Sequence, residues 1–205
     1  MNFPPQLTDY ITQVQRLLHD TAARFWATTE LTDYINQARN RVTLDTGCLR
    51  SNESVPFVAA QETYSYPSGV MDVININYQW SNLLYGLKYY SFSQLNSRYR
   101  LVTNLQSPPE AWGQQQQLIY IEPIPNQNYT AYFDCILFPT VMVNPTDTET
   151  IPYPFYDNVP YYAAYLAVLK QGELQKAQWF QNLYTEFQRA NAASRTTKGY
   201  INNGY

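Results

Sequence analysis

The side chains that most often carry catalytic or metal chemistry are sparse and isolated in this sequence. Its one histidine, His19, stands beside Asp20 and could act as a general base or a metal ligand. No nucleophile lies near it, and a cation is favoured at the end of a helix in any case, so we predict no site there. Cys48 and Cys135 have no Cys-x-x-Cys partner or histidine cluster, which argues against zinc and fits a reducing compartment.

The acidic residues and the glycines also lack a catalytic pattern. None of the sixteen carboxylates forms a closely spaced pair in an apolar setting. Asp147 and Glu149 lie in a polar stretch, which predicts that both are solvated. The seven glycines form no phosphate-binding loop or dinucleotide fingerprint, so we expect no enzyme and no cofactor. A glycan hydrolase whose carboxylates converge from distant segments is the least favoured alternative.

Composition favours protein contact over binding to nucleic acid or membrane. Of 205 residues only 14% are charged, whereas 20 are tyrosine and 35 are asparagine or glutamine. The net charge of −3 argues against a broadly basic surface for nucleic acid. No stretch approaches the roughly 20 apolar residues of a membrane span, and the first residues do not read as a secretory signal. An uncharged surface rich in Tyr, Asn and Gln is typical of partly hydrated protein contacts.

Apolar periodicity predicts a helical hairpin at the N-terminus. Residues 7–18 carry one apolar stripe at helical spacing, and residues 31–42 carry another. Gly47 is suited to end the second helix. Phe25 and Trp26 fall in the connection, where we expect them to pack between the two helices.

The central region changes to the alternating pattern of strands. Residues 74–80 and 83–89 predict a hairpin across a two-residue turn, and residues 118–122 and 129–138 predict a second pair. Residues 107–113 carry prolines and a glycine, which predicts a loop. Six or seven short strands at this spacing indicate a small antiparallel barrel or sandwich.

Helical periodicity returns after a proline-punctuated stretch. A third helix is expected after Pro160, Gly172 interrupts it, and the pattern of a fourth ends at Ala193. We therefore predict an α+β fold, a bundle of about four main helices with an inserted small antiparallel β domain. The predicted parts are the N-terminal hairpin 1–50, the β insertion 51–145, the C-terminal helices 146–193 and an extended tail 194–205.

Two groups of residues are candidates for contact with a partner. Tyr153, Phe155 and Tyr156 lie in the proline-rich stretch, where little core is available, so we expect some of them at a subunit interface. The last acidic residue precedes a basic tail. The tail is either a frayed terminus or a segment that orders against a partner. In the second case its binding residues are Arg195, Lys198, Tyr200, Ile201 and Tyr205.

Several short motifs occur in a characteristic order. A first helix ends near Asp20, Trp26 precedes the second helix, and that helix carries an acid–Leu and then an Ile–Asn pattern. The later motifs are Tyr64–Pro67, Pro108–Gly113, Leu118–Pro123 followed by Pro125, and the helices from Pro160 to Phe187. This order resembles the tailed-phage head-to-tail adaptors, the connector proteins that bind below the portal. The turn at 125–128 lacks the expected glycine, and residues after 193 match no part of the pattern.

The resemblance implies a structural virion protein at the head–tail junction, made in the host cytoplasm. Such adaptors form a ring, usually of twelve copies, that docks to the portal protein and carries tail or nozzle proteins. Double-stranded DNA would pass through the ring without sequence-specific binding, and no membrane would be involved. The C-terminal segment would enter the portal, and the helices would form the ring wall. Another phage tail or capsid accessory protein is the alternative.

Overall fold

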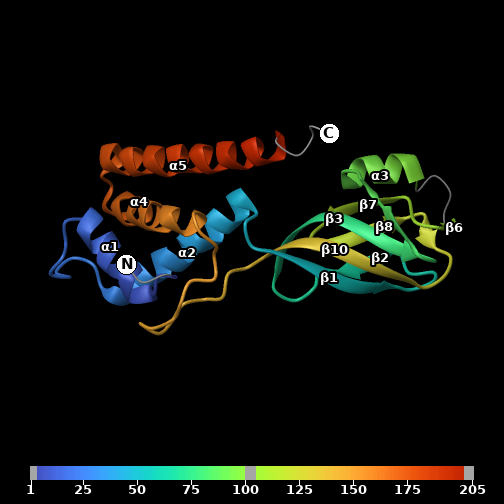
Figure 1. The fold of residues 1–205 in the computed structure, drawn as a ribbon, viewed down its shortest axis with the longest axis horizontal. Coiled ribbons are helices and arrows are strands. Elements are labelled where there is room, and N and C mark those ends of the chain that lie inside the picture. The colour runs from blue at the N-terminus through green and yellow to red at the C-terminus, as the bar shows by residue number, and fades with distance from the viewer. Residues whose placement is uncertain (1–3, 100–104, 201–205) are drawn as a thin grey trace. The chain divides into compact units, whose positions relative to one another are not determined.

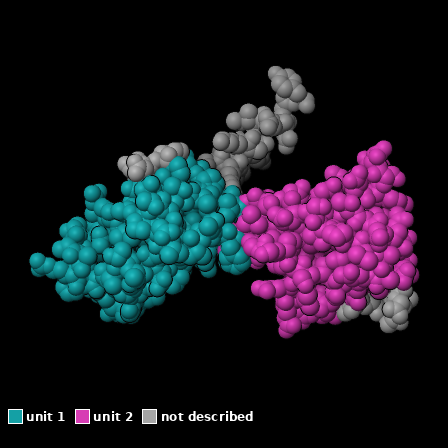
Figure 2. All heavy atoms as spheres, turned by 90° about the horizontal axis from the view of Figure 1, so that it is seen from below, with its two compact units in different colours: residues 1–49, 138–205 teal, residues 50–137 magenta. Residues whose placement is uncertain are grey.

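The chain divides into two compact units. A computed structural model describes residues 4–99 and 105–200. The helical unit comprises residues 1–49 and 138–205, and the β unit comprises residues 50–137 (Figures 1 and 2). The combination of helices with mainly antiparallel strands confirms the predicted α+β class. Within the described residues, none of the helices is long and apolar enough to cross a membrane.

Four α-helices build the described part of the helical unit. They are α1 (Leu7–Leu17), α2 (Thr28–Thr46), α4 (Val159–Gln171) and α5 (Leu174–Tyr200), with a short 3-10 helix η1 (Phe155–Asn158) before α4. Their apolar stripes meet in one core that includes the fully buried Leu31, Val168 and Phe180. Gly47 and Gly172 cap α2 and α4 with φ of +54° and +79°, a conformation that glycine adopts without steric cost.

The connection between α1 and α2 differs from the prediction at one aromatic residue. Trp26 is buried and meets Tyr34 edge to face, with ring centroids 6.2 Å apart, but Phe25 is 81% exposed. The carboxylate of Asp20 accepts the backbone N–H groups of Arg24, Phe25 and Trp26. Burial would raise the pKa of Asp20, but these three donors outweigh it and lower the pKa. This tight turn directs only Trp26 inward.

In its described residues, the β unit is a sandwich of two four-stranded sheets. Its strands are β1 (Arg50–Phe57), β2 (Thr63–Ser65), β3 (Val70–Trp80), β4 (Leu83–Gly86), β5 (Lys88–Tyr89), β6 (Gln106–Ser107), β7 (Ala111–Gln115), β8 (Leu118–Glu122), β9 (Ile124–Pro125) and β10 (Tyr129–Leu137). The sheet orders are β1-β10-β3-β4 and β2-β8-β7-β5, and β6 pairs with β9. Both sheets contribute to one apolar core that contains Phe57, Trp112 and Phe133.

The observed strand pairing matches the predicted pairing in one hairpin and differs from it in the second predicted pair. The hairpin of β3 and β4 across Ser81–Asn82 is confirmed, with Trp80 opposite Leu83. The predicted pairing of β8 with β10 is wrong, because the two strands lie in different sheets. The connection between them carries Pro123 and Pro125, which cannot donate to a ladder, and it leads the chain from one sheet to the other.

The segment predicted to be a loop before β8 forms part of a strand. Residues 111–113 open β7, and Trp112 is 1% exposed. The short helix α3 (Phe92–Tyr99) packs on β7 and β8. A Cβ atom at Gly113 would lie 2.8 Å from the backbone oxygen of Tyr90 and 3.3 Å from Leu95 Cδ2. Glycine is therefore needed at this close approach and does not mark a turn.

A β-bulge in β3 changes which side chains reach the core. Val73 pairs with Cys135 and Asn75 pairs with Asp134, so Ile74 is an extra residue in the ladder. Ile74 is 41% exposed, although the alternation predicted it on the same face as the buried Ile76. The bulge shifts the alternation by one residue.

The C-terminal helix also continues further than its apolar pattern. The structure extends α5 to Tyr200, where the sequence predicted an extended tail from residue 194. A helix can continue without an apolar stripe because its backbone hydrogen bonds are internal. Residues 201–205 lie outside the described residues.

Candidate assembly surfaces

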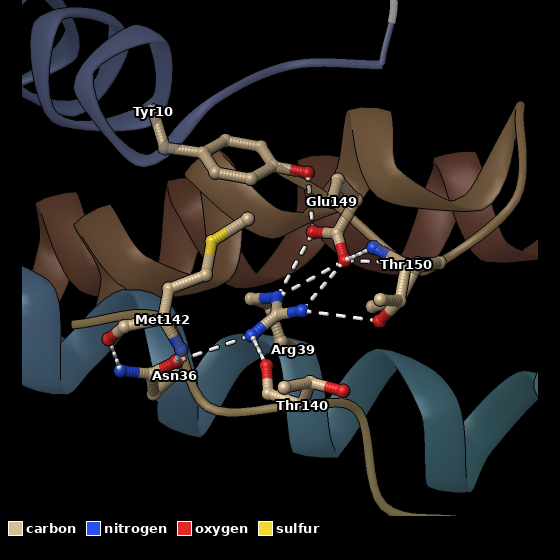
Figure 3. A network of polar contacts seen from close by, with 8 residues as sticks. Tyr10, Asn36, Arg39, Thr140, Met142, Glu149 and Thr150 are labelled. Carbon is tan, nitrogen blue, oxygen red and sulfur yellow. Dashed lines mark hydrogen bonds and ion pairs between the residues drawn. The ribbon is translucent and has the colours of Figure 1, made fainter. Parts of the chain in front are cut away.

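A buried ion pair holds the segment that follows the β unit. We call residues 138–151 the crossing segment. Arg39 of α2 and Glu149 have side chains 1% and 0% exposed, with Arg39 Nη2 2.8 Å from Glu149 Oε1 and Nε 2.9 Å from Oε2 (Figure 3). The prediction that Glu149 is solvated is therefore wrong, because the residue finds its partner on a distant helix.

The guanidinium of Arg39 reaches the start of the crossing segment as well. Its Nη1 donates to the backbone oxygen of Thr140 at 2.6 Å and to Asn36 Oδ1 at 3.2 Å (Figure 3). The Arg39 side chain thus binds Thr140 near the start of the crossing segment and Glu149 near its end. A buried pair of this kind is weak evidence for net stability, but losing one partner leaves an uncompensated charge, so the pair strongly disfavours other positions of the segment.

The carboxylate of Glu149 has its remaining acceptor sites filled. It accepts the Tyr10 hydroxyl of α1 at 2.7 Å and the backbone N–H groups of Thr150 and Ile151 at 2.7 and 2.9 Å. Burial, together with the neighbouring Glu149 charge, raises the pKa of Tyr10 far above its usual range. The phenol stays protonated and keeps donating. The crossing segment is therefore tied to both α1 and α2.

A side-chain amide holds the middle of the crossing segment as a neighbouring strand would. Asn36 Nδ2 donates to the Met142 backbone oxygen at 2.9 Å, and the Met142 N–H donates to Asn36 Oδ1 at 3.0 Å (Figure 3). Met142 is 1% exposed, whereas Val141 and Val143 on either side are 64% and 71% exposed. The segment is therefore a fixed, extended piece of chain that presents two valines to solvent.

Asp147 closes the turn that follows these valines. Its carboxylate accepts the backbone N–H groups of Val143 at 2.7 Å and Asn144 at 2.8 Å. These bonds, led by that from Val143, lower the pKa of Asp147. The side chain is half-buried, so the prediction of full solvation holds only in part for this residue. Thr8 fixes the far side of the turn by donating its hydroxyl to Pro145 O at 2.7 Å.

The β unit presents its own apolar residues at the β3–β4 hairpin. Leu83 and Leu84 are 61% and 66% exposed, and Trp80 and Tyr85 are about 40% exposed (42% and 39%). The Trp80 and Tyr85 ring centroids lie 5.7 Å apart, and Tyr85 stacks on Tyr78 at 5.6 Å. Every residue of β4 is exposed, and β4 is the last strand of its sheet. A short apolar edge strand of this kind is a ready site for pairing with another chain.

Open hollows border both presented segments. One of about 540 Å³ lies along the crossing segment and is lined by Val141 and Val143 among others. Another of about 460 Å³ lies beside β4 and is lined by Trp80, Tyr85 and Gly86 among others. A third of about 340 Å³ lies over the amide-rich outer face of the same sheet. All three are open and mixed in polarity, which suits protein contact better than an enclosed ligand pocket.

The predicted subunit-interface residues occupy different environments. Tyr153 is 63% exposed, with its ring 5.9 Å from that of Tyr156. Phe155 and Tyr156 are buried in the core of the helical unit, because η1 turns them inward ahead of α4. Of the three, only Tyr153 presents most of its side chain to solvent.

Three of the five residues predicted to bind a partner through the tail lie in the C-terminal helix. Arg195, Lys198 and Tyr200 lie in the last turns of α5. Ile201 and Tyr205 lie outside the described residues. The tail therefore stays a prediction as a binding segment.

The residues considered first for chemistry are not brought together. His19 is exposed at the end of α1, Cys48 is half-buried and Cys135 is buried in the β core. Burial raises the pKa of the Cys135 thiol to about 11, which keeps it protonated. Across residues 4–99 and 105–200, no group of three His, Cys, Asp or Glu residues could hold a metal ion.

Sequence reasoning missed Arg39 and Asn36, although one signal was available. Arg39 follows Ile35 by one helical turn on the buried stripe of α2, and a charge in such a stripe needs a partner. The identity of that partner had no local signal, because Glu149 is 110 residues away in the sequence.

Comparison with models of known protein families gives a match over most of the chain. The model of the SU10 adaptor protein family matches residues 5–202. A search of curated proteins finds no match.

Proposed function

The chain belongs to the SU10 adaptor protein family, and from this membership we propose that it is a head-to-tail adaptor of a tailed phage. In this role it is a structural virion component that forms a ring under the portal, extends the DNA channel and docks tail components. The observation that carries the proposal is the extent of the family match, which spans both units of the fold.

The surface supports a role in repeated protein contact. Large apolar side chains are exposed on fixed elements of each unit, at Val141 and Val143 and at Leu83 and Leu84. Few charges would have to be desolvated around them, because only 14% of the residues are charged. A ring needs two different, complementary patches on each subunit, and a charge-poor protein can supply them at low electrostatic cost.

The proposed partners follow from the position in the virion. They are other copies of the chain, with twelve as the expected number, the portal protein above and a tail nozzle or other tail protein below. Double-stranded DNA would pass without sequence-specific contacts. The net charge of −3 supports easy passage, because each phosphate contact to a cationic surface would add affinity.

The C-terminal segment is the proposed portal contact. Arg195, Lys198 and Tyr200 follow the last acidic residue, Glu186, on α5. Together with Ile201 and Tyr205 they would meet an acidic surface and anchor in apolar pockets.

Co-assembly with the portal protein of the same phage tests the proposal. The full chain is mixed with purified portal rings, and the complex is measured by size-exclusion chromatography with light scattering. We expect a stable complex with several adaptor copies per portal ring. Failure to bind under conditions in which both proteins are folded would overturn the role as a portal adaptor.

A truncated chain tests the tail contact separately. Deletion of residues 194–205 leaves the described cores intact, since their buried residues end before this segment. We expect the truncated chain to lose stable portal binding while its circular dichroism remains that of a folded protein. A complex that survives the deletion unchanged would contradict portal binding by the tail.

A further inference from the structure

Two backbone edges in the described part of the chain have groups that no strand pairs with, and the two edges are similar in length and character. One is the outer edge of β4, and the other is the outer edge of the crossing segment at Val141 and Val143. We propose that the crossing segment of one copy adds as a strand to β4 of the next copy. This contact rests on the proposed function, since it names the surfaces by which adaptor copies would join.

The edge of β4 follows from the register of its hairpin. A two-residue loop makes Trp80 and Leu83 the hydrogen-bonded closing pair, and such pairs then alternate along the ladder. The alternation agrees with the Leu87 N–H, which donates to the Ile76 oxygen at 2.9 Å. Leu84 and Gly86 therefore direct their N–H and C=O groups away from β3. No strand of the described residues covers that side.

The edge of the crossing segment follows from its contact with α2. Met142 directs both its N–H and its C=O toward the Asn36 amide. In an extended chain the neighbouring residues direct theirs to the opposite side. The Val143 N–H bonds to Asp147, whereas the Val141 N–H and C=O and the Val143 C=O have no hydrogen-bond partner in the part of the chain that the structure describes. The crossing segment thus offers both backbone groups of Val141 and the C=O of Val143, spaced i and i+2 like Leu84 and Gly86 on β4.

Side chains and space suit the same pairing. The valines are β-branched and would lie opposite Leu84 and Gly86, so one valine would contact the Leu84 side chain on the same face of the sheet. An open hollow of about 540 Å³ borders the valines, and another of about 460 Å³ lies next to Tyr85 and Gly86 of β4. No Lys, Arg or Pro lies within β4 itself to block an approaching edge.

The occupant of β4 is a second copy because the chain cannot reach its own edge. Leu137, the last residue of β10, pairs with Val70, while Leu84 pairs with Gln79. Two register shifts leave extra residues in β3, so the separation is counted along β10, where Gln79 pairs with Thr130, seven residues from Leu137, or about 23 Å at about 3.3 Å per residue. Gly86, at the near end of the edge, lies opposite Asn77, which pairs with Tyr132, five residues or about 17 Å from Leu137. Val141 follows Leu137 by four residues, which span at most about 14 Å when fully extended. The segment must therefore pair with β4 of another molecule.

This contact is heterologous, because β4 of one copy meets a different segment of the next. A joined pair of copies therefore still has one free β4 edge and one free crossing-segment edge. Repetition of the contact closes a ring where the rotation between neighbours divides the circle. A contact between two identical patches would stop at a dimer. The two cases give different results when defective variants are mixed.

Single lysine variants test the contact. Leu84→Lys puts a charge on the β4 edge, and Val141→Lys puts one on the edge of the crossing segment, so each variant keeps one edge intact. Both side chains are exposed, so we expect both variants to fold. By sedimentation velocity, we expect the wild-type chain to form species larger than a dimer as concentration rises to about 100 μM, and each variant to lose association at least tenfold. The matched control Leu174→Lys, at a leucine 69% exposed on α5, should assemble as the wild type does.

Mixing the two variants gives the sharpest result. An equimolar mixture of the Leu84→Lys and Val141→Lys chains has one intact pair of edges, so it should form dimers and nothing larger. A wild-type chain that stays monomeric, a Val141→Lys chain that assembles normally, or a mixture without dimers would overturn the contact. Portal binding is scored separately. If both variants bind the portal in normal copy number, the proposed contact is wrong and the proposed function remains. If the wild-type chain assembles but does not bind the portal, the contact remains and the proposed function is wrong.

Discussion

The crossing segment and the β3–β4 hairpin present similar apolar side chains by different means. Val141 and Val143 are held exposed by a few side chains, chiefly Arg39 and Asn36 of α2 and Asp147 of the following turn. The leucines of β4 are held by a ladder of main-chain pairs with β3. The position of the valines thus depends on a few polar side chains, whereas the position of the β4 leucines depends on a row of equivalent main-chain pairs.

This difference decides how each surface responds to substitution. A buried polar network is costly to leave half satisfied, so one change in α2 should disturb the crossing segment strongly. A hairpin ladder distributes its stability, so a change at an exposed position of β4 should leave the β unit almost unaffected. The following predictions test that contrast.

The largest effect is expected at the buried ion pair. Arg39→Met leaves Glu149 charged and buried without its main partner, and we expect it to lower the free energy of unfolding by about 3–5 kcal/mol. Urea unfolding followed by circular dichroism measures the change. The double variant Arg39→Met/Glu149→Leu removes both charges and should recover a large part of the loss. Equal losses for the single and double variants would contradict the assigned role of the pair.

A smaller loss is expected at the amide that holds Met142. Asn36→Ala leaves the Met142 N–H and C=O without their partner, and we expect a cost of about 1–3 kcal/mol. Amide hydrogen exchange should accelerate at Met142 more than in the strands of the β unit. Asn40, one turn further along α2, offers a matched control, since Asn40→Ala changes no bond described for the crossing segment. Unchanged exchange at Met142 would show that the amide does not hold the segment.

Acid should loosen the turn at Asp147. Its pKa in the folded chain lies below the usual value because the backbone N–H groups of Val143 and Asn144 bind the charged form. The stabilisation is therefore fully present above about pH 4 and is lost as pH falls through the lower folded pKa. We expect the Val143 and Asn144 amide resonances to titrate with a midpoint below about 3.9, and to lose this titration in Asp147→Asn. A midpoint above that value would contradict the assigned bonds.

The smallest effect is expected on the exposed edge of the hairpin. Leu84→Lys should change the free energy of unfolding by no more than about 0.5 kcal/mol, because its side chain is 66% exposed. Thermal unfolding measures this. A loss comparable to that of Arg39→Met would mean that the two surfaces are held in the same way.

Local patterns predicted the local parts of this fold. The stripes of α1, α2, α4 and α5 and the β3–β4 hairpin depend on residues close in sequence, and the helix-ending roles of Gly47 and Gly172 need only one backbone conformation. Trp112 was predicted to lie in a loop, because the prolines just before it indicate a turn and β7 begins directly after them.

Nonlocal pairing explains the remaining differences. Nothing near Glu149 reveals that it meets Arg39, and no periodicity reports that β8 and β10 belong to different sheets. The bulge at Ile74 is likewise a property of the β3–β10 ladder and has no signature in β3 alone. For the same reason, Glu149 in the crossing segment was predicted to be solvated, although it is buried.

A cryo-electron microscopy reconstruction of the complex between this chain and its portal tests the central claim most directly. The predicted result is a closed ring of adaptor copies on the portal, with residues 140–143 of each copy lying as a strand along Leu83–Gly86 of its neighbour. A portal without adaptor density, or a ring in which both edges stay solvent-exposed, would contradict it.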